Sequence, residues 1–345
     1  MTRPRDASLL TTNGNTPLVK LDRLTRNLDG NIFAKLEYLS PGLSKKDRVA
    51  LQMIEDAERD RRLQKGQTVV ELTSGNMGTG LAIVCRLKGY PFIAVMSKGN
   101  SIERAQMMTA FGAEVVLVDQ MPGSVPGQVT GEDLALVETE ARRLTEKHKA
   151  FRADQFINPS TMDVGEKKIG QEIIEQLDAL QPDIFVDFMG TGGSFVGVTK
   201  ALKKAYPQLI CLGVEPDEAP FYSVKGEFDG KHQIQGGGYY QQLCFVERHR
   251  ELVDGFVTVS DEAAIEAARL LASTECIFAG FSSGANTAAA LKLLKAEHQG
   301  KNIVVLMPDS GTKYLSTGLW ENEAWNRVHP KKVDPTCRKS ANRAD

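Results

Sequence analysis

Short runs of β-branched and apolar residues alternate with longer segments of helical periodicity along most of this chain, and this alternation restricts its fold more than any other feature. Six runs have the composition of strands, at residues 68–72, 92–96, 114–119, 183–189, 209–215 and 302–307. Strands that alternate with helices are typical of a mainly parallel sheet whose faces are covered by helices. The sequence therefore predicts an α/β fold with mainly parallel, twisted sheets.

The six runs fall into two groups, separated by a loop rich in proline and glycine at 120–133 and a charged helix at 134–149. Two groups of strands in one chain favour two α/β domains, because each group can form its own sheet. We predict domains at residues 1–160 and 161–320. Residues 321–345 lack apolar periodicity and are predicted to form a polar tail.

The composition is that of an ordinary globular protein, with 345 residues, 41% hydrophobic and 25% charged. Because 42 Lys+Arg balance 44 Asp+Glu, the chain has no general basic field that would hold nucleic acid or an anionic membrane. No apolar run has the length of a signal peptide core or a membrane span. Five scattered cysteines without C-x-x-C spacing predict neither a metal site nor a disulfide framework. We expect a cytoplasmic protein with small-molecule partners or further subunits.

Two adjacent lysines stand where a predicted turn becomes a helix, in the stretch PGLSKKDR at 41–48. Ser44 is a favourable N-cap for this helix. Lys46 is in phase with the apolar residues Ala50, Met53, Ile54 and Ala57, whereas Lys45 shares its side with Gln52 and Asp56. We predict that Lys46 faces inward, where burial lowers its pKa and makes it an amine nucleophile that forms Schiff bases. The alternative is that Lys46 reaches water along the helix edge.

Three stretches rich in glycine and serine offer polar ligands next to predicted strands. FMGTGGSFVG links a strand to a helix, so the backbone N–H groups of Gly190 to Ser194 can hold a phosphate. ELTSGNMGTG also follows a strand and offers groups suited to a carboxylate and a phenolic oxygen, those of Thr73, Ser74, Gly75 and Asn76. FAGFSSGANTAAALKL places Ser282 and Ser283 at the start of a helix, where a cap is the ordinary role.

A nicotinamide-dependent enzyme is one alternative for the Gly190 loop. Glu215 stands at a strand end about twenty residues after the loop, as does the ribose-binding acid of dinucleotide-binding folds. Phe195 nevertheless replaces the third glycine of that fingerprint, and the P-loop pattern is absent. A simple structural turn is a further alternative for a lone glycine loop.

Eight motifs taken together are more specific than any one of them: GNTPL (14–18), S-x-K-D-R (44–48), TSGN-x-G (73–78), SIER (101–104), GTGGS (190–194), GVEP (213–216), SSGA (282–285) and PDSGTKYLST (308–317). In these motifs and their order, the chain resembles the cysteine synthase and cystathionine β-synthase family of pyridoxal-phosphate (PLP) enzymes over residues 12–318.

The resemblance implies the fold-type II arrangement, similar to tryptophan synthase β, with the cofactor between two domains and the residues before about 44 packed on the second domain. It implies that Lys46 holds the PLP aldehyde as a Schiff base, that Asn76 contacts the 3-oxygen of the ring, and that Ser282 faces the pyridine nitrogen. The phosphate would be bound by Gly190, Thr191, Gly192, Gly193 and Ser194. The substrate side would consist of Thr73, Ser74, Gly75, Met77 and Tyr239, with Gln241 as a further candidate. A homodimer is also implied.

The implied activity is β-replacement on an activated serine, such as O-acetylserine or O-phosphoserine, which gives cysteine or another β-substituted alanine through an aminoacrylate intermediate. Lys46, displaced by the substrate amine, would remove the α-proton as general base. Two alternatives stay open. One is a lyase or deaminase that eliminates the β-group without replacement, and the other is a non-catalytic PLP-binding regulatory relative.

Several departures from the family pattern fall on the substrate side. Met77 stands where the family usually has threonine, and the usual N-P-x-G-S turn has Ser40 and Leu43 in place of asparagine and glycine. The segment GEKKIG at 165–170 lacks the usual histidine and threonine, and 120–133 resembles an insertion at the rim of the cleft. The cofactor residues are intact, so the resemblance indicates the reaction class more firmly than the substrate.

Overall fold

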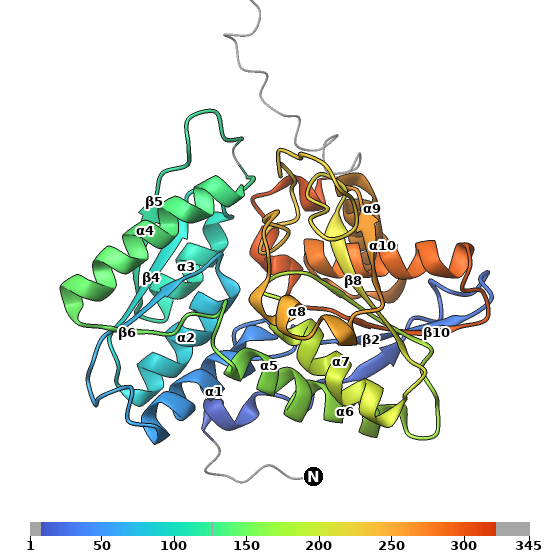
Figure 1. Cartoon of the computed structure of the whole chain (residues 1–345), viewed down its shortest axis with the longest axis horizontal. Coiled ribbons are helices and arrows are strands. Elements are labelled where there is room, and N and C mark those ends of the chain that lie inside the picture. The colour runs from blue at the N-terminus through green and yellow to red at the C-terminus, as the bar shows by residue number, and fades with distance from the viewer. Residues whose placement is uncertain (1–7, 126, 322–345) are drawn as a thin grey trace, which may run out of the picture.

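The structure is a computed structural model and describes residues 8–125 and 127–321. Apart from its first residue, the predicted polar tail at 321–345 lies outside the described residues. Figure 1 shows two sheets lying side by side, each covered by helices. The predicted α/β class with mainly parallel sheets is confirmed.

The smaller sheet has four parallel strands in the order β5-β4-β3-β6. Its strands are β3 (Val69–Leu72), β4 (Phe92–Ser97), β5 (Glu114–Val118) and β6 (Phe151–Arg152). Its helices are α1 (Lys46–Arg59), α2 (Asn76–Lys88), α3 (Ile102–Ala110) and α4 (Gly131–His148). The helices α2 and α3 pack on one face and α4 on the other, so both faces of the sheet are buried. Burial on both faces explains why every residue of β4 is buried and apolar or small.

The larger sheet has the order β1-β2-β10-β7-β8-β9, and only the β1–β2 pair is antiparallel. Its strands are β1 (Leu18–Lys20), β2 (Asn31–Lys35), β7 (Ile184–Phe188), β8 (Ile210–Pro216), β9 (Gly255–Val259) and β10 (Asn302–Leu306). Its helices are α5 (Ser160–Val164), α6 (Gly170–Leu177), α7 (Gly193–Ala205), α8 (Cys244–Arg248), α9 (Asp261–Leu270) and α10 (Phe281–Lys295).

Short helical turns complete the secondary structure. Four are 3-10 turns, η1 (Leu9–Thr12), η3 (Arg250–Leu252), η5 (Gly311–Tyr314) and η6 (Gly318–Trp320), and two are π-helical, η2 (Gly165–Ile169) and η4 (Leu271–Glu275). The unusual GEKKIG segment thus forms η2 and the start of α6. Within the described ranges, none of the helices combines the length and apolar character needed to span a bilayer.

All six predicted strands are present, with ends within one residue of the prediction. Four strands were not predicted: β1, β2, β6 and β9. The first two join the larger sheet although they precede the smaller sheet in the chain, because β2 pairs with β10. The helix predicted from residue 134 begins at Gly131, because Thr130 and Asp133 form a capping box. The division into domains near residue 160 stays a proposal.

Three apolar clusters form the interior. One joins α1 and α2 to α6 and α7, and so connects the two sheets. A second packs α9 and α10 on the other face of the larger sheet, and a third packs α4 on the smaller one. Cys85 and Cys211 are fully buried in the first cluster, where they pack as small hydrophobic residues.

A buried ionic network fixes α1 against the larger sheet. Glu172 on α6 accepts from Lys35 Nζ at 2.7 Å and from Arg48 Nη2 at 2.9 Å. Arg48 Nη2 also donates to Glu37 Oε1 at 2.7 Å. The side chains of Lys35 and Arg48 are at most 2% exposed, so loss of their partner leaves uncompensated charge in the interior. Because Arg48 follows Lys46 by two residues, this network also positions the start of α1.

We expect Glu172→Gln to lower the free energy of unfolding at pH 7 by about 3 kcal/mol. Burial alone would raise the pKa of Glu172, but hydrogen bonds and charges from Arg48 and then Lys35 lower it from 4.5 to about 2. A depressed carboxyl pKa stabilises the fold above the unfolded value, and this stability is lost as pH falls through the folded value. In urea unfolding at several pH values, the free energies of unfolding of wild type and variant should therefore become equal as the pH falls from 4.5 to about 2.

The matched control is Glu166→Gln, which removes the partly exposed Lys200–Glu166 pair at 2.8 Å. An exposed pair of this kind contributes less than about 1 kcal/mol. Equal losses in the two variants, or parallel pH profiles for Glu172→Gln and wild type, would contradict the role given to the buried network.

Candidate active site

Two adjoining cavities meet at Lys46, the first residue of α1. We call them the Ser194 cavity and the Met77 cavity, after a residue that lines each. Lys46, Asn76, Gly190 and Thr191 line both. Gly192, Ser194 and Ser282 line the first, and Thr73, Ser74, Met77 and Tyr239 line the second. The structure thus brings together residues that lie far apart in the sequence and that the motifs singled out.

Two predicted site residues, Gly75 and Gly193, are not among the described residues that line either cavity. Gly75 instead shapes the loop before α2, and Gly193 begins α7. Gly75 has a φ of +124°, and a Cβ there would lie 2.4 Å from Arg104 Cδ. A Cβ on Gly193 would lie 2.4 Å from Thr161 Cγ2. Both positions therefore require glycine for steric reasons, independently of any ligand.

The amine of Lys46 is poised between its charged and neutral forms. Burial is the main cause that lowers its pKa, and the charge of Lys45 adds to it; Asp187 and Glu71 act in the opposite direction. Together they bring the pKa of Lys46 from 10.5 to about 7. A substantial fraction of Lys46 is therefore an uncharged amine near neutral pH, as Schiff-base formation requires.

The prediction that Lys45 lies on the outward side of the helix is wrong. Its Nζ is 2.7 Å from Asp187 Oδ2, and the two side chains are 10% and 1% exposed. Helical periodicity fails at this position because α1 begins at Lys46 and Lys45 is the residue before it. For the same reason Ser44 is not the N-cap, although its Oγ accepts a hydrogen bond from Lys46 N at 3.3 Å.

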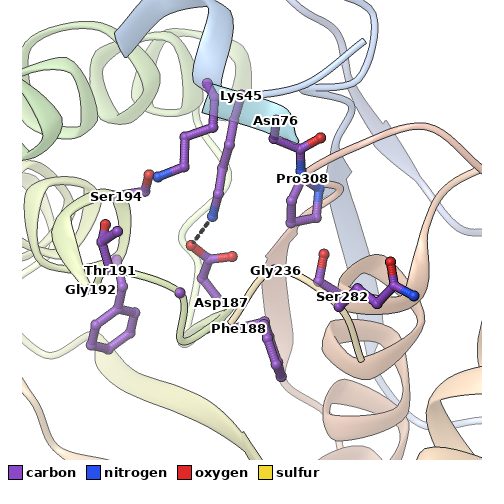
Figure 2. A pocket seen from close by; sticks show the side chains of 14 residues that line it. Lys45, Asn76, Asp187, Phe188, Thr191, Gly192, Ser194, Gly236, Ser282 and Pro308 are labelled. Atoms are coloured by element: carbon purple, nitrogen blue, oxygen red, sulfur yellow. Dashed lines mark hydrogen bonds and ion pairs between the residues drawn. The ribbon is translucent and has the colours of Figure 1, made fainter. Parts of the chain in front are cut away.

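Asp187 is a site residue that the sequence reasoning missed. It lies in β7, lines the Ser194 cavity, and accepts a second hydrogen bond from Asn286 Nδ2 at 3.2 Å. Figure 2 shows it in the middle of the cavity, facing Lys45, with Ser194 and Thr191 to one side and Ser282 to the other. A carboxylate inside the apolar run DIFVDFM was a usable signal, because a buried charge requires a partner.

The loop between β7 and α7 has the form of an anion site. Gly192 adopts a left-handed φ of +80° and precedes Gly193, the first residue of the 13-residue helix α7. The backbone N–H groups at this end of the helix favour negative charge. Ser194 Oγ is buried and, within the described part of the chain, has no hydrogen-bond partner. An unpaired buried hydroxyl beside a helix N-terminus fits a phosphate that is not part of the protein.

The loop between β3 and α2 is held by its own side chains. Thr73 Oγ1 accepts from Gly75 N and Gly78 N, each at 2.9 Å. Ser74 Oγ is in short hydrogen-bond contact with the hydroxyl of Tyr239, which comes from the other half of the chain. The sulfur-containing side chain of Met77 is buried and completes the wall of its cavity.

Asn76, the first residue of α2, has both ends of its amide paired. Its Nδ2 donates to Asp309 Oδ2 at 2.8 Å, and its Oδ1 accepts from Lys313 Nζ at 2.7 Å. Asp309 also accepts from the Tyr314 hydroxyl at 2.7 Å. Burial lowers the pKa of Lys313 to about 8, against the opposing charges of Asp309 and Asp47. The PDSGTKYLST motif therefore fixes the orientation of the Asn76 amide.

Glu215 and Gln241, two further candidates from the sequence, line neither of the two cavities that meet at Lys46. Glu215 accepts from the backbone N–H groups of Tyr222 and Ser223, at 2.9 and 3.0 Å, and thereby shapes the loop after β8. This role differs from the ribose binding that the nicotinamide alternative required. Gln241 lines a separate cavity with Phe156 and Leu134 rather than the two that meet at Lys46.

The described residues of the segment 120–133 lie against the second half of the chain. Asp133 organises it by accepting from Met121 N and Ser124 Oγ, each at 2.8 Å. Gln235, which lines the Ser194 cavity, donates from Nε2 to Gly127 O at 3.1 Å. The segment therefore lies near the site, in agreement with its predicted place at the rim.

Comparison with known proteins identifies the family of this chain. A family model described as "Pyridoxal-phosphate dependent enzyme" matches residues 9–309. A cysteine synthase of Staphylococcus aureus is 40% identical over 309 residues, which is 89% of this chain and 94% of that protein.

Two solved structures are similar over nearly their whole length. The crystal structure of an O-ureido-L-serine synthase has a TM-score of 0.82 and 34% identity, covering 97% of this chain and 99% of that one. A hydrogen sulfide-producing enzyme from Fusobacterium nucleatum has a TM-score of 0.81 and 36% identity, covering 89% and 99%. Because the family model covers most of the chain and the cysteine synthase is 40% identical over 89% of it, the chain belongs to the family of pyridoxal-phosphate-dependent enzymes.

Proposed function

We propose that this enzyme catalyses β-replacement on an activated serine and gives cysteine or another β-substituted alanine. The observation that carries the proposal is that Lys46, whose pKa is lowered, lines both the Ser194 cavity and the Met77 cavity. One cavity suits a cofactor and the other a small amino acid. Relatives named cysteine synthase and O-ureido-L-serine synthase make β-substituted alanines by name, which supports the assignment.

In the proposed cofactor site, Lys46 would hold the aldehyde of PLP, Asn76 would contact the 3-oxygen and Ser282 would face the pyridine nitrogen. The loop Gly190 to Ser194 binds the phosphate, and the unpaired hydroxyl of Ser194 is the best argument for this assignment. When bound, PLP supplies an electron sink that makes the α-proton of an amino acid removable. The pairing of Asn76 with Asp309 and Lys313 holds its amide in one orientation.

Lys46 is also the proposed general base. Lys46 Nζ lines the Met77 cavity, and with a pKa of about 7 roughly half of it is neutral at pH 7. It can therefore accept the α-proton. Thr73 and Ser74, on the loop that Gly75 shapes, would bind the substrate carboxylate, and Tyr239 would position Ser74 through their hydroxyl contact.

β-Elimination without replacement is the second candidate. Met77 favours it, because a buried thioether in the substrate cavity replaces a hydroxyl that could hold the substrate carboxylate. The similar enzyme from Fusobacterium nucleatum is named for producing hydrogen sulfide, a product that elimination from cysteine would give. The non-catalytic alternative is set aside, since Lys46 is in place and the family is one of enzymes.

We further propose that the enzyme is a cytoplasmic homodimer that takes an amino acid and a small nucleophile as substrates. The assembly rests on the family resemblance, and light scattering of the purified chain tests it. A monomer at working concentration would contradict the proposed assembly.

We expect purified full-length protein to carry the visible absorbance band of lysine-bound PLP, and Lys46→Ala to abolish it and lower turnover about a thousandfold or more. Titration with O-acetylserine, O-phosphoserine, serine and cysteine, with and without sulfide, identifies the donor. Product that requires sulfide supports replacement, whereas keto acid and ammonia without a nucleophile support elimination. The exposed Lys65→Ala is the control; absence of the band in wild type would refute the PLP assignment.

Replacement of Ser194 by alanine should raise the Kd for PLP about tenfold, because a hydroxyl that binds a charged phosphate is lost. The free energy of unfolding of the PLP-free chain should change little, since Ser194 Oγ has no partner among the described residues. Ser283→Ala is a matched control. The Oγ of Ser283, on α10, is also buried and without a hydrogen-bond partner among the described residues, but Ser283 is not among the residues that line the two cavities. Equal affinities in both variants would place the phosphate elsewhere.

Tyr239→Phe removes the hydroxyl that contacts Ser74. We expect KM for the amino acid donor to rise about fivefold with kcat within about twofold, as follows when an interaction common to ground state and transition state is lost. Steady-state kinetics measures both constants. Tyr240→Phe is the control, because its hydroxyl donates to Gly226 O at 2.5 Å and lies outside the two cavities. A fall in kcat alone would argue against a substrate-positioning role.

A further inference from the structure

A buried ion pair lies inside the proposed cofactor site and is not used by the proposed function. Lys45 Nζ and Asp187 Oδ2 are 2.7 Å apart, with side chains 10% and 1% exposed. Both residues line the Ser194 cavity together with Lys46 and the glycine loop. Figure 2 shows the pair spanning the cavity.

Asp187 is fixed from two directions, which makes it a firm anchor for Lys45. It lies in β7, a strand in the middle of the larger sheet, and its other oxygen accepts from Asn286 Nδ2 at 3.2 Å. Asn286 is itself held by Leu306 O at 2.8 Å. Lys45 is therefore kept at one place in the cavity.

Stability alone does not account for this pair. A buried ion pair loses much of its hydration energy, and apolar residues of similar volume are often as stable or more stable. Here the pair is placed at the residue next to the proposed nucleophile, in the same cavity. Its position favours an effect on the chemistry of Lys46.

We propose that Lys45, anchored by Asp187, is a positioning residue that keeps the amine of Lys46 uncharged, so that Lys46 can bind the PLP aldehyde and later accept a proton. Two ammonium groups in one cavity disfavour each other, and a cationic neighbour is an established means of activating a lysine. The inference rests on the proposed function, because only a PLP enzyme needs this amine free.

The charges around Lys46 give the sign of the effect. Lys45 beside it disfavours the ammonium form, whereas Asp187 on β7 and Glu71 on β3 favour it. Glu71 is already engaged by Arg152 at 3.6 Å and by the backbone of Asp154 and Gln155. Asp187 in turn is offset by Lys45. Removal of Lys45 should therefore increase the protonated fraction of Lys46, and removal of the charge of Asp187 should decrease it.

The test measures Lys46 itself rather than turnover. The full-length chain is freed of cofactor with hydroxylamine, and return of the visible band on adding PLP shows that the site is intact. Lys46 is then labelled with trace acetic anhydride across a pH series and quantified by mass spectrometry, since only the neutral amine reacts. In the wild type we expect half-maximal labelling near pH 7, the value about which Lys46 titrates.

At pH 6, Lys45→Met should label Lys46 about tenfold more slowly than wild type, because a smaller fraction of the amine is neutral. Asp187→Asn should label it about twofold faster. The double variant should return toward wild type, and Lys45→Arg, which keeps the charge, should match wild type. Opposite directions in the two single variants are a result that loosened packing would not give.

An unchanged labelling curve in Lys45→Met, or a shift of both single variants in the same direction, would overturn the inference. If Lys45→Met does not fold, Asp187→Asn decides alone: a curve that is unmoved or moved to higher pH overturns the inference. Failure of the proposed function appears separately, as a wild-type protein without a visible band or without reaction with any amino acid.

Discussion

The direction of the parallel strands is the constraint on which the rest of this structure depends. Because neighbouring strands run the same way, the loops after β3, β7 and β10 emerge at the carboxyl ends of their sheets, where α/β proteins bind ligands. These loops carry Thr73 to Asn76, Gly190 to Ser194, and Pro308 with Asp309. All three contribute to one site, although they come from two sheets.

The site lies where the two halves of the chain meet, and α1 makes the connection. Its apolar side belongs to the cluster that joins both sheets, and Arg48 ties it to Glu172 on the far half. Lys46 at its first residue is thereby held at the junction, partly withdrawn from water. Burial gives the amine its reactivity, so the same packing that stabilises the fold prepares the chemistry.

Charge is distributed around this amine in pairs. Lys45 is matched by Asp187, and Lys313 contacts Asn76, which also binds Asp309. In an interior of low polarity each of these groups would be costly alone. Paired, they allow a polar cavity to exist inside an apolar molecule and hold each side chain in a single orientation. The substrate cavity is less polar, since Met77 forms part of its wall.

The sequence by itself determined most of the local elements and, through its resemblance to a family, the reaction class. The strand runs, the glycine loop and the motif order were enough to predict the fold class, six strands and the importance of Lys46, because periodicity and turn chemistry are written into neighbouring residues. Tertiary structure alone decided what lies opposite each element. The pairing of β2 with β10 joins residues 31–35 to 302–306, and no local pattern encodes so distant a partner. Lys45 illustrates the same limit: the predicted N-cap Ser44 placed it inside the helix on the outward side, whereas its burial depends on Asp187, a carboxylate 142 residues away whose position only the folded sheet defines.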